Sequence, residues 1–296
     1  MVTIKKKTIG NKEYYYLEHS FRKGKSVKKK ELYLGHEIPK NIDEIKRDFI
    51  SSIYKEKWYE ILEKIKTGFS REIKSMPKSD REKATEAFMV RFTYDTQRIE
   101  GSKLTLRETA NLLEKGISPN KKPLRDIKEA EAHMKVFYEV LEYKKELSLN
   151  VALYWHKKLF NETKQDTAGK IRKHGVVISG SKFTPPLPVE INPLLNDFFS
   201  WYSKNRAKIH PVKLAALVHL KFVTIHPFGD GNGRISRLMM NFVLKKHKYP
   251  LFDIPYTNRN SYYNALERSQ TKNEESIFVQ WFIRNYIKEN KKYLLF

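Results

Sequence analysis

The sequence predicts a mainly α-helical fold that carries one inserted β-hairpin and follows a small basic β segment. Apolar residues recur at three- and four-residue steps through most of residues 41–291, which indicates amphipathic helices. Residues 3–35 instead alternate and are rich in Tyr, Ile and Val, which indicates short strands. Residues 174–188 combine β-branched residues with glycines and prolines, a composition typical of a short hairpin followed by an extended segment.

The N-terminal residues 1–40 are expected to form a basic, β-rich domain of two or three antiparallel strands. The expected strand sequences are TIKKKTI, EYYYLEHSF and VKKKELYLG, with turns at Gly10-Asn11 and Lys23-Gly24. From Asn41 the apolar period becomes helical. Residues 41–78 are therefore expected to be a helical linker region of one long helix or two in succession, punctuated by Pro77.

The remaining residues, 79–296, are expected to form one helical domain. Thr105 and Glu108 have the spacing of a capping box, which predicts a helix that opens there and ends at Gly116. The other expected helices run over about 80–97, 123–141, 148–160, 193–203, 212–225, 235–246, 261–270 and 276–291.

Composition limits the classes of protein that the chain can represent. Its 296 residues are 40% apolar, which is globular composition, and the absence of cysteine excludes disulfides, thiolate metal sites and cysteine nucleophiles. There is no leader-like segment and no apolar run of membrane-spanning length, so we expect a cytoplasmic protein with no membrane partner.

The balance of charge is strongly basic. The chain has 58 Lys and Arg against 34 Asp and Glu, a net charge of +24, and residues 1–40 hold eleven basic and four acidic residues. Such a field attracts phosphates of any kind. Three interpretations stay open: a solvated lysine-rich surface, which we favour, contact with nucleic acid, or attraction of an acidic protein.

Residues 225–237, IHPFGDGNGRISR, hold the densest group of chemically useful side chains. Glycines just before a helix let backbone amides close around an anion, and Arg234 and Arg237 would project from one face of the first turn. Asp230 is suited to hold Mg²⁺ against phosphate oxygens, and His226 is the natural general base. The segment predicts a site for a nucleoside triphosphate with Mg²⁺, where His226 deprotonates an attacking hydroxyl.

The segment HPFGDGNGRISR resembles the signature of Fic-domain enzymes, HPFx(D/E)GNGRxxR, at every specified position. The similarity covers roughly residues 80–290 and leaves residues 1–75 unaccounted for. It implies a Fic-type helical bundle with a β-hairpin flap. It also implies ATP and Mg²⁺ as cofactors, AMP transfer to a Ser, Thr or Tyr hydroxyl of a target protein, and a homodimer as one arrangement of the chain.

The same resemblance implies a role for each residue of the signature. His226 is the expected catalytic base, Asp230 the expected metal ligand, and Arg237 the group expected to meet the γ-phosphate. The other phosphates are expected to be held by the backbone amides of Gly231, Asn232 and Gly233 and by the side chain of Arg234.

Three further groups are implied outside the signature. The flap is expected to pair with an extended segment of the target by strand addition and to cover the nucleotide. It comprises Val177, Ile178, Ser179 and Gly180. Tyr262 and Tyr263 are expected to approach the adenine. Gln270 stands where family members often carry Asn.

The stretch TQRIEG, residues 96–101, resembles the inhibitory motif (S/T)xxxE(G/N) of the family. On their own, Thr96 and Glu100 would be capping or surface groups. With the signature present, Glu100 is expected to pair with Arg237 and fill the space of the γ-phosphate, which predicts a self-inhibited enzyme.

Four alternatives stay open at this point. A related glutamate in some family members positions water for removal of AMP, so both directions of the reaction fit. A Fic-like transferase could use another phosphate donor, in a kinase-like reaction or in phosphocholine transfer. The basic N-terminal segment could instead form a nucleic-acid-binding module.

Overall fold

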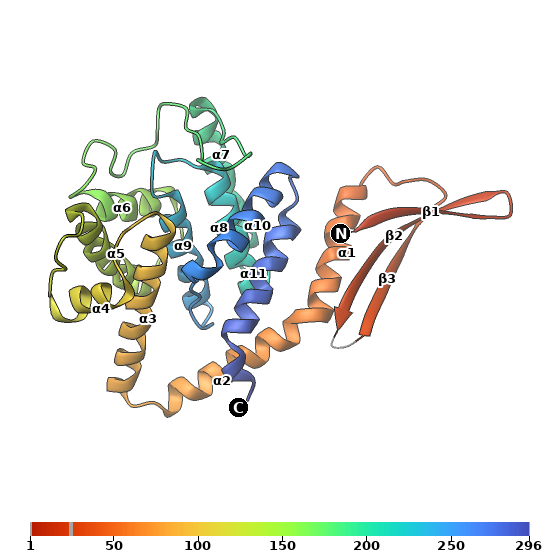
Figure 1. The fold of residues 1–296 in the computed structure, drawn as a ribbon. Coiled ribbons are helices and arrows are strands. Elements are labelled where there is room, and N and C mark those ends of the chain that lie inside the picture. Colours follow the sequence, from red (N-terminus) through yellow and green to blue (C-terminus); the bar gives the residue numbers. More distant parts are fainter. Residues whose placement is uncertain (1, 24–25, 296) are drawn as a thin grey trace. The chain divides into compact units, whose positions relative to one another are not determined.

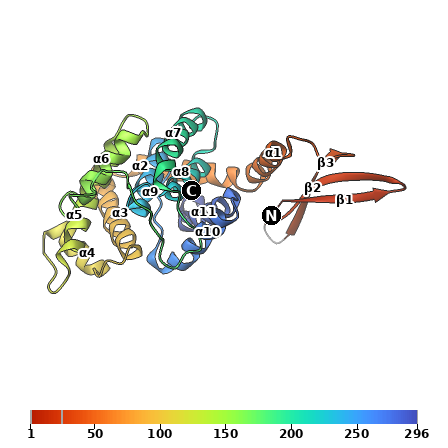
Figure 2. The same cartoon turned by 90° about the horizontal axis from the view of Figure 1, so that it is seen from above.

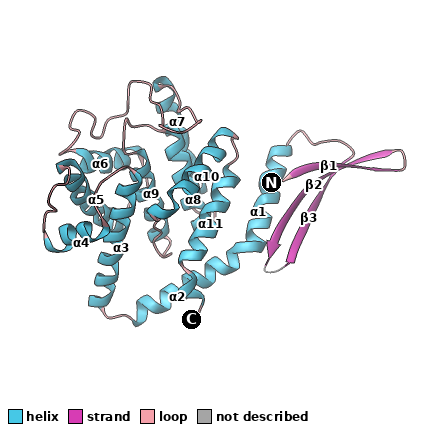
Figure 3. Cartoon of the chain, in the orientation of Figure 1, coloured by secondary structure: helices cyan, strands magenta, loops and turns pink. Residues whose placement is uncertain are grey.

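The structure, a computed structural model, describes residues 2–23 and 26–295. The chain divides into two compact units, Met1–Lys64 and Ile65–Phe296. In the described residues, helices dominate and the strands lie in the first unit (Figure 3). The mainly α-helical prediction with a preceding β segment is thereby confirmed. Gly24, half of the second expected turn, lies outside the described residues.

The first unit contains a three-stranded antiparallel sheet in the order β1-β2-β3 (Figure 1). Its strands are β1 (Thr3–Ile9), β2 (Lys12–Lys23) and β3 (Ser26–Gly35). Leu17, at the centre of β2, is fully buried and packs with Phe21 against Phe49 and Ile53 of helix α1 (Ile42–Tyr54). The alternating pattern of the strands therefore supplies one apolar face, which α1 covers.

The helical region after residue 41 is continuous but irregular. Helix α1 passes into a π-helical turn, Lys55–Tyr59, and then into α2 (Glu60–Ser75), whose residues are divided between the two units. A π turn holds one extra residue and shifts the apolar stripe. This shift explains why the sequence pattern fits one long helix and two successive helices equally well.

The second unit is helical, and α8 and α9 form its centre (Figures 1 and 2). Helix α8 contacts α7 and α11, and α9 contacts α3, α5 and α6. The helices are α3 (Lys78–Ile99), α4 (Leu106–Lys115), α5 (Leu124–Glu142), α6 (Leu149–Phe160), α7 (Pro188–Asn205), α8 (Pro211–Ile225), α9 (Asn232–Lys246), α10 (Arg259–Thr271) and α11 (Glu275–Glu289).

Local sequence signals define several of these helix ends. The capping box of Thr105 and Glu108 is present, and Gly116 ends α4 with φ 67°. Helix α7 begins at Pro188, earlier than the expected start at Pro193. Proline fits the first helical position, which Pro188 occupies. The carboxylate of Glu190 accepts a hydrogen bond from the N–H of Leu187, the residue before this proline.

The segment between α6 and α7 differs from the expected hairpin. Within residues 171–187 the described backbone has no strand, and a single turn joins Ser181 N–H to the Ile178 carbonyl at 3.1 Å, with Gly180 at φ +75°. Prolines lack the N–H that a ladder needs, and Val177 is 91% exposed. The segment is therefore an extended loop whose backbone finds no strand partner within the described chain.

Candidate active site

His226 ends helix α8 in the left-handed conformation, with φ 53°. Its Nδ1 lies 3.2 Å from the Val223 carbonyl, so the neutral ring donates from Nδ1 and keeps Nε2 as the acceptor nitrogen. Burial lowers the pKa of His226 below the usual 6.5, against the opposing influence of the Val223 contact and of Glu100 and Asp230. The imidazole is therefore neutral near pH 7 and able to accept a proton.

The loop between α8 and α9 is closed by Asn232. Its side chain accepts from Phe228 N–H at 2.9 Å and donates to the Phe228 carbonyl at 2.8 Å. Gly231, with φ +83°, packs so tightly that a Cβ would overlap the Phe160 ring. The side chain of Asn232 is thus committed to loop geometry. The expected role of the Gly231 amide in an anion site is not seen here, because this N–H donates to Asp230 Oδ1 at 2.5 Å.

The carboxylate of Glu100 lies over the N-terminal turn of α9. A Cβ on Gly233 would collide with Glu100 Oε1, so the absence of a side chain at Gly233 lets the carboxylate approach the helix. A helix N-terminus carries partial positive charge and favours an anion. In this structure the anion at that position is Glu100.

Arg237 joins three helices beneath this carboxylate. Its Nη2 pairs with Glu100 Oε1 at 2.5 Å, its Nε donates to Thr96 Oγ1 at 2.6 Å, and its Nη1 donates to the Tyr262 hydroxyl at 3.2 Å. Burial alone would lower the pKa of Arg237, but Tyr262 and Glu100 raise it above its ordinary value. The expected pairing of Glu100 with Arg237 is confirmed as geometry.

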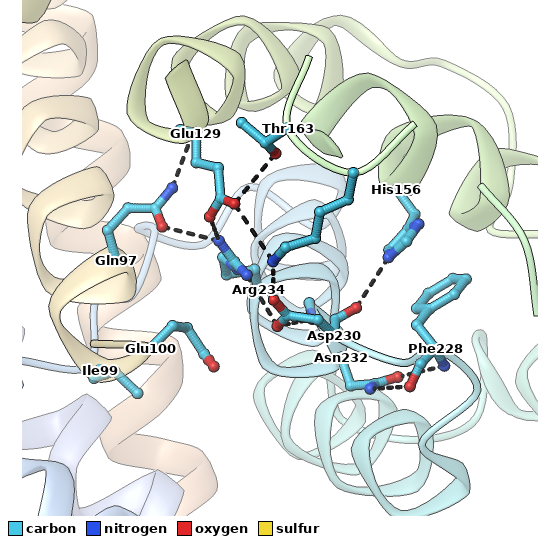
Figure 4. A network of polar contacts seen from close by, with 12 residues as sticks. Gln97, Ile99, Glu100, Glu129, His156, Thr163, Phe228, Asp230, Asn232 and Arg234 are labelled. Carbon is cyan, nitrogen blue, oxygen red and sulfur yellow. Dashed lines mark hydrogen bonds and ion pairs between the residues drawn. The ribbon is translucent and has the colours of Figure 1, made fainter. Parts of the chain in front are cut away.

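Arg234 is 2% exposed, and protein groups surround its guanidinium. It pairs with Glu129 of α5, donates to Gln97 Oε1 of α3 at 3.0 Å and meets Asp230 Oδ1 at 3.0 Å (Figure 4). In this structure Arg234 therefore ties α9 to α3 and α5. The expected contact of Arg234 with phosphate is not what holds the side chain here.

Asp230 accepts contacts on both carboxylate oxygens and on its backbone carbonyl. Lys164 and Arg234 flank the carboxylate, and the carbonyl accepts from His156 Nε2 at 3.0 Å (Figure 4). Burial alone would raise the pKa of Asp230, but the charges of Arg234 and Lys164 hold it below its ordinary value. Asp230 is therefore an ionised carboxylate at the start of α9.

The structure places Tyr262, Tyr263 and Gln270 in three different surroundings. Tyr262 is 1% exposed, and its hydroxyl is 3.0 Å from His219 Nε2, so the ring lies behind Arg237 and has no open face for adenine. Tyr263 is partly exposed and donates to the Ile99 carbonyl at 3.0 Å. Gln270 donates to Thr224 Oγ1 at 3.1 Å and lines a cavity of about 320 Å³.

The flap residues Val177, Ile178, Ser179 and Gly180 belong to the extended loop that starts after Arg172. The Arg172 guanidinium donates to the carbonyls of His226 at 2.8 Å, His174 at 2.9 Å and Pro186 at 2.6 Å. One buried side chain thus fastens both ends of the loop to the backbone of the candidate base.

Sequence reasoning missed Lys164, Glu129 and Arg172. A glutamate on an otherwise apolar helix face, as at Glu129 between Ile127 and Ala130, is the signal that could have revealed a buried ion pair.

Among residues 2–23 and 26–295, no three or more His, Asp or Glu side chains gather in a way that could hold a metal ion alone. Asp230 is a single carboxylate, which suits a cation that shares its coordination with phosphates and water. In the same described residues, no helix has the length and apolar character of a membrane span.

Comparisons with known proteins find related sequences and folds. Residues 146–244 match the sequence model of the Fic/DOC family. A protein named Protein adenylyltransferase Fic from Drosophila ananassae is 35% identical over 178 residues, which cover 59% of this chain and 35% of that protein. Its namesake from Aedes aegypti is 33% identical over 190 residues, covering 62% and 38%. The chain thus spans little more than a third of the length of these relatives.

Solved structures extend the likeness. A Fic-domain-containing signaling protein from Bacteroides thetaiotaomicron superposes with a TM-score of 0.72 at 23% identity, over 79% of this chain and 95% of that one. A Fic-1 fragment from C. elegans gives 0.68 at 24% identity, over 88% and 78%. At these identities the likeness shows the fold.

Proposed function

We propose that this chain, whose residues 146–244 match the Fic/DOC family model, transfers AMP from ATP to a Ser, Thr or Tyr hydroxyl of a target protein. The observation that carries the proposal is His226, whose Nε2 is left as an acceptor at the start of the loop that leads to the N-terminus of α9. The names of the relatives from Drosophila ananassae and Aedes aegypti support the same activity.

The proposed reaction is a displacement at the α-phosphorus. The target hydroxyl oxygen forms a bond to this phosphorus, the bond to the β-phosphate oxygen breaks, and pyrophosphate leaves. Nε2 of His226 takes the hydroxyl proton, while its Nδ1–H stays on the Val223 carbonyl and fixes the tautomer. The amides of Asn232 and Gly233 at the start of α9 hold the phosphate charge.

The proposal includes Mg²⁺ at Asp230, which is partly exposed and ionised at the start of α9. When bound there, Mg²⁺ would neutralise charge on the phosphate oxygens during the displacement.

We further propose that Glu100 inhibits this reaction from within the chain. Its carboxylate lies over the N-terminus of α9 and pairs with Arg237, so it occupies both groups that a terminal phosphate would use. A nucleotide must displace Glu100 before its γ-phosphate can reach Arg237. The wild-type chain is therefore expected to have low basal activity.

Removal of AMP is a second candidate activity. The charge of Glu100 opposes the lowering of the pKa of His226, so the carboxylate lies within electrostatic range of the candidate base. In this direction a water oxygen attacks the phosphorus of the modified target. The target oxygen leaves with a proton, and AMP is released.

The experiment that tests the proposal is incubation of the purified chain with ATP and Mg²⁺, read by intact mass. Glu100→Gly should raise self-modification by AMP roughly ten- to a hundred-fold, because a hydrogen bond to a charged group contributes about 1.5–3 kcal/mol. His226→Ala in the Glu100→Gly background should abolish the adduct.

Glu114→Gly is the matched control, since it removes an exposed carboxylate at the end of α4. Equal modification of wild type and Glu100→Gly would contradict the inhibitory role. A gain of one phosphate in place of AMP would establish phosphoryl transfer from ATP as the reaction instead.

A further inference from the structure

Asp230 is fully engaged in the structure, even though it is the expected metal ligand. Oδ1 accepts from the Gly231 N–H at 2.5 Å and from Arg234 at 3.0 Å, and Oδ2 is paired with the ammonium of Lys164. A cation that approaches Oδ2 must therefore compete with the ammonium of Lys164, which already lies on this oxygen.

Lys164 and Arg234 together neutralise two carboxylates. Arg234 bridges Glu129 and Asp230 from inside the domain, and Lys164 bridges the same pair from the loop after α6, with 3.4 Å to Glu129 Oε1. Glu129 also accepts from the hydroxyl of Thr163 at 3.2 Å. Two positive and two negative charges form one closed network, so the site is balanced before any metal arrives.

The two cations differ in how easily they can leave Asp230. The Arg234 guanidinium is 2% exposed, keeps Gln97 and Glu129 as partners and lies 4.5 Å over the Phe160 ring. Lys164 is 26% exposed, and Asp230 is 43% exposed. A lysine has a flexible stem and a single ammonium, whereas a buried guanidinium is fixed by several directed contacts. An entering cation therefore meets Lys164 first.

Displacement of Lys164 leaves no buried charge without a partner. Its ammonium already lies within ion-pair distance of Glu129 and 4.7 Å over the Phe160 ring, so it can keep these two contacts when it leaves Oδ2. Asp230 then exchanges one positive neighbour for another.

We propose that Lys164 is a built-in counterion of Asp230 that a divalent cation must displace, and that Lys164 thereby sets the metal concentration that the site requires. The proposal rests on Asp230 being the metal ligand of the proposed function. It assigns Lys164 a positioning role, with no contact to the reacting atoms.

The test is binding of Mn²⁺ to the chain in the presence of saturating ADP, whose phosphates complete the coordination, followed by electron paramagnetic resonance. Lys164→Met removes the charge and keeps the length, and it should tighten Mn²⁺ binding about ten-fold, the effect of losing one charge-assisted contact that competes with the metal. Lys164→Arg, which retains the charge, should stay within about two-fold of wild type. Lys158→Met is the matched control, because it removes a surface lysine of α6 that pairs with Glu139.

Unchanged or weaker Mn²⁺ binding in Lys164→Met would overturn the counterion role. Asp230→Asn separates this failure from failure of the proposed function. Loss of Mn²⁺ binding in Asp230→Asn with no change in Lys164→Met overturns the role of Lys164 alone. Undiminished binding in Asp230→Asn overturns Asp230 as the ligand, and the role of Lys164 with it.

Thermal unfolding gives a second readout that needs no turnover. Lys164→Met should have a lower Tm than wild type in EDTA, because Asp230 loses a partner, and Mg²⁺ should raise the Tm of the variant more than that of wild type. An equal deficit with and without Mg²⁺ would indicate packing alone and contradict the proposal.

Discussion

At the scale of single residues, several side chains of the signature segment build the loop rather than face a ligand. The side-chain amide of Asn232 is hydrogen-bonded to the backbone of Phe228. The guanidinium of Arg234 contacts Glu129, Gln97 and Asp230. What remains for an anion is backbone N–H groups at the start of α9 and the one guanidinium, Arg237, that Glu100 covers. A site made of amides is rigid, and a rigid site costs little reorganisation when charge develops.

Arg172 provides the first residue-scale prediction. A lysine at this position keeps the charge but cannot reach the carbonyls of His174, Pro186 and His226 together, because it lacks the planar fork. In the Glu100→Gly background, Arg172→Lys should lower the rate of AMP transfer about ten-fold and change ATP affinity less, as loop and base lose their common support. The three carbonyls, which are partly buried, lose a charged donor, so the Tm should also fall.

The measurements for Arg172→Lys are the initial rate of self-modification and calorimetric binding of ATP. Lys173→Arg is the matched control, because it exchanges one basic side chain for another at the neighbouring exposed position. If Arg172→Lys transfers AMP at the same rate as its parent, the loop does not need the three contacts of the Arg172 guanidinium.

The contacts that the sequence predicted at this scale are those carried by contiguous motifs. Glu100 and Arg237 were expected to pair, and they do. Lys164 with Asp230, Arg234 with Glu129, and Arg172 with His226 are separated by 66, 105 and 54 residues, and no spacing rule links such pairs. The burial of Tyr262 was not predicted, because a Tyr-Tyr pair does not reveal which ring faces the core.

At the scale of secondary-structure elements, α3 is held on two sides. Thr96 and Glu100 face Arg237, whereas Asp95 accepts from Tyr256 N–H at 2.6 Å and lies beside Asp253. Both aspartates line a cavity of about 720 Å³. The position of the proposed inhibitory glutamate therefore depends on contacts on the far side of its own helix.

The pairing of Asp253 with Asp95 should make the stability of the chain depend on pH. Burial, and then the charge of Asp95, raise the pKa of Asp253 well above its usual 3.8, while Arg91 acts in the opposite direction. The folded chain thus holds this proton more tightly than the unfolded chain, and stability falls as pH rises from the ordinary pKa through the raised one. Asp253→Asn removes that ionisation. The Tm of this variant minus the Tm of wild type should therefore increase from pH 5 to pH 8.

The measurement is the Tm of both proteins over that pH range. Asp43→Asn is the matched control, because the Asp43 side chain is 84% exposed. A difference between Asp253→Asn and wild type that does not change with pH would contradict the buried, proton-retaining carboxyl.

Element boundaries were predictable where the chain carries its own caps. The helix between Thr105 and Gly116 begins with a local hydrogen-bonded cap and ends at a residue with positive φ. The residue types at both ends predict these features. The expected hairpin at 174–188 depends instead on a pairing partner, and β-branched residues alone do not supply one. The start of α7 was missed because Pro188 was assigned to that extended segment.

At the scale of the whole molecule, the net charge of +24 is distributed among paired groups as well as single ones. On the face of the sheet opposite α1, Lys5 and Lys29 pair with Glu18, and Lys7 and Lys29 pair with Glu31. Lysines that alternate with carboxylates do not form a continuous basic surface. The composition of residues 1–40 therefore overstates how positive this face is.

This distribution leads to a prediction for nucleic acid. The intact chain should bind duplex DNA through diffuse charge only, so the affinity should fall about 10³-fold between 50 and 200 mM salt if some six phosphates are contacted, and sequence should not matter. Glu18→Gln with Glu31→Gln frees the lysines of the sheet face. Glu37→Gln with Glu44→Gln makes the same change in net charge at exposed positions of the same unit.

Fluorescence anisotropy across a salt series should show equal gains in DNA affinity for the two double variants. A gain confined to Glu18→Gln with Glu31→Gln, or binding that persists at 200 mM salt, would instead identify the sheet as a nucleic-acid interface, because only a shaped site retains phosphates when counterions compete.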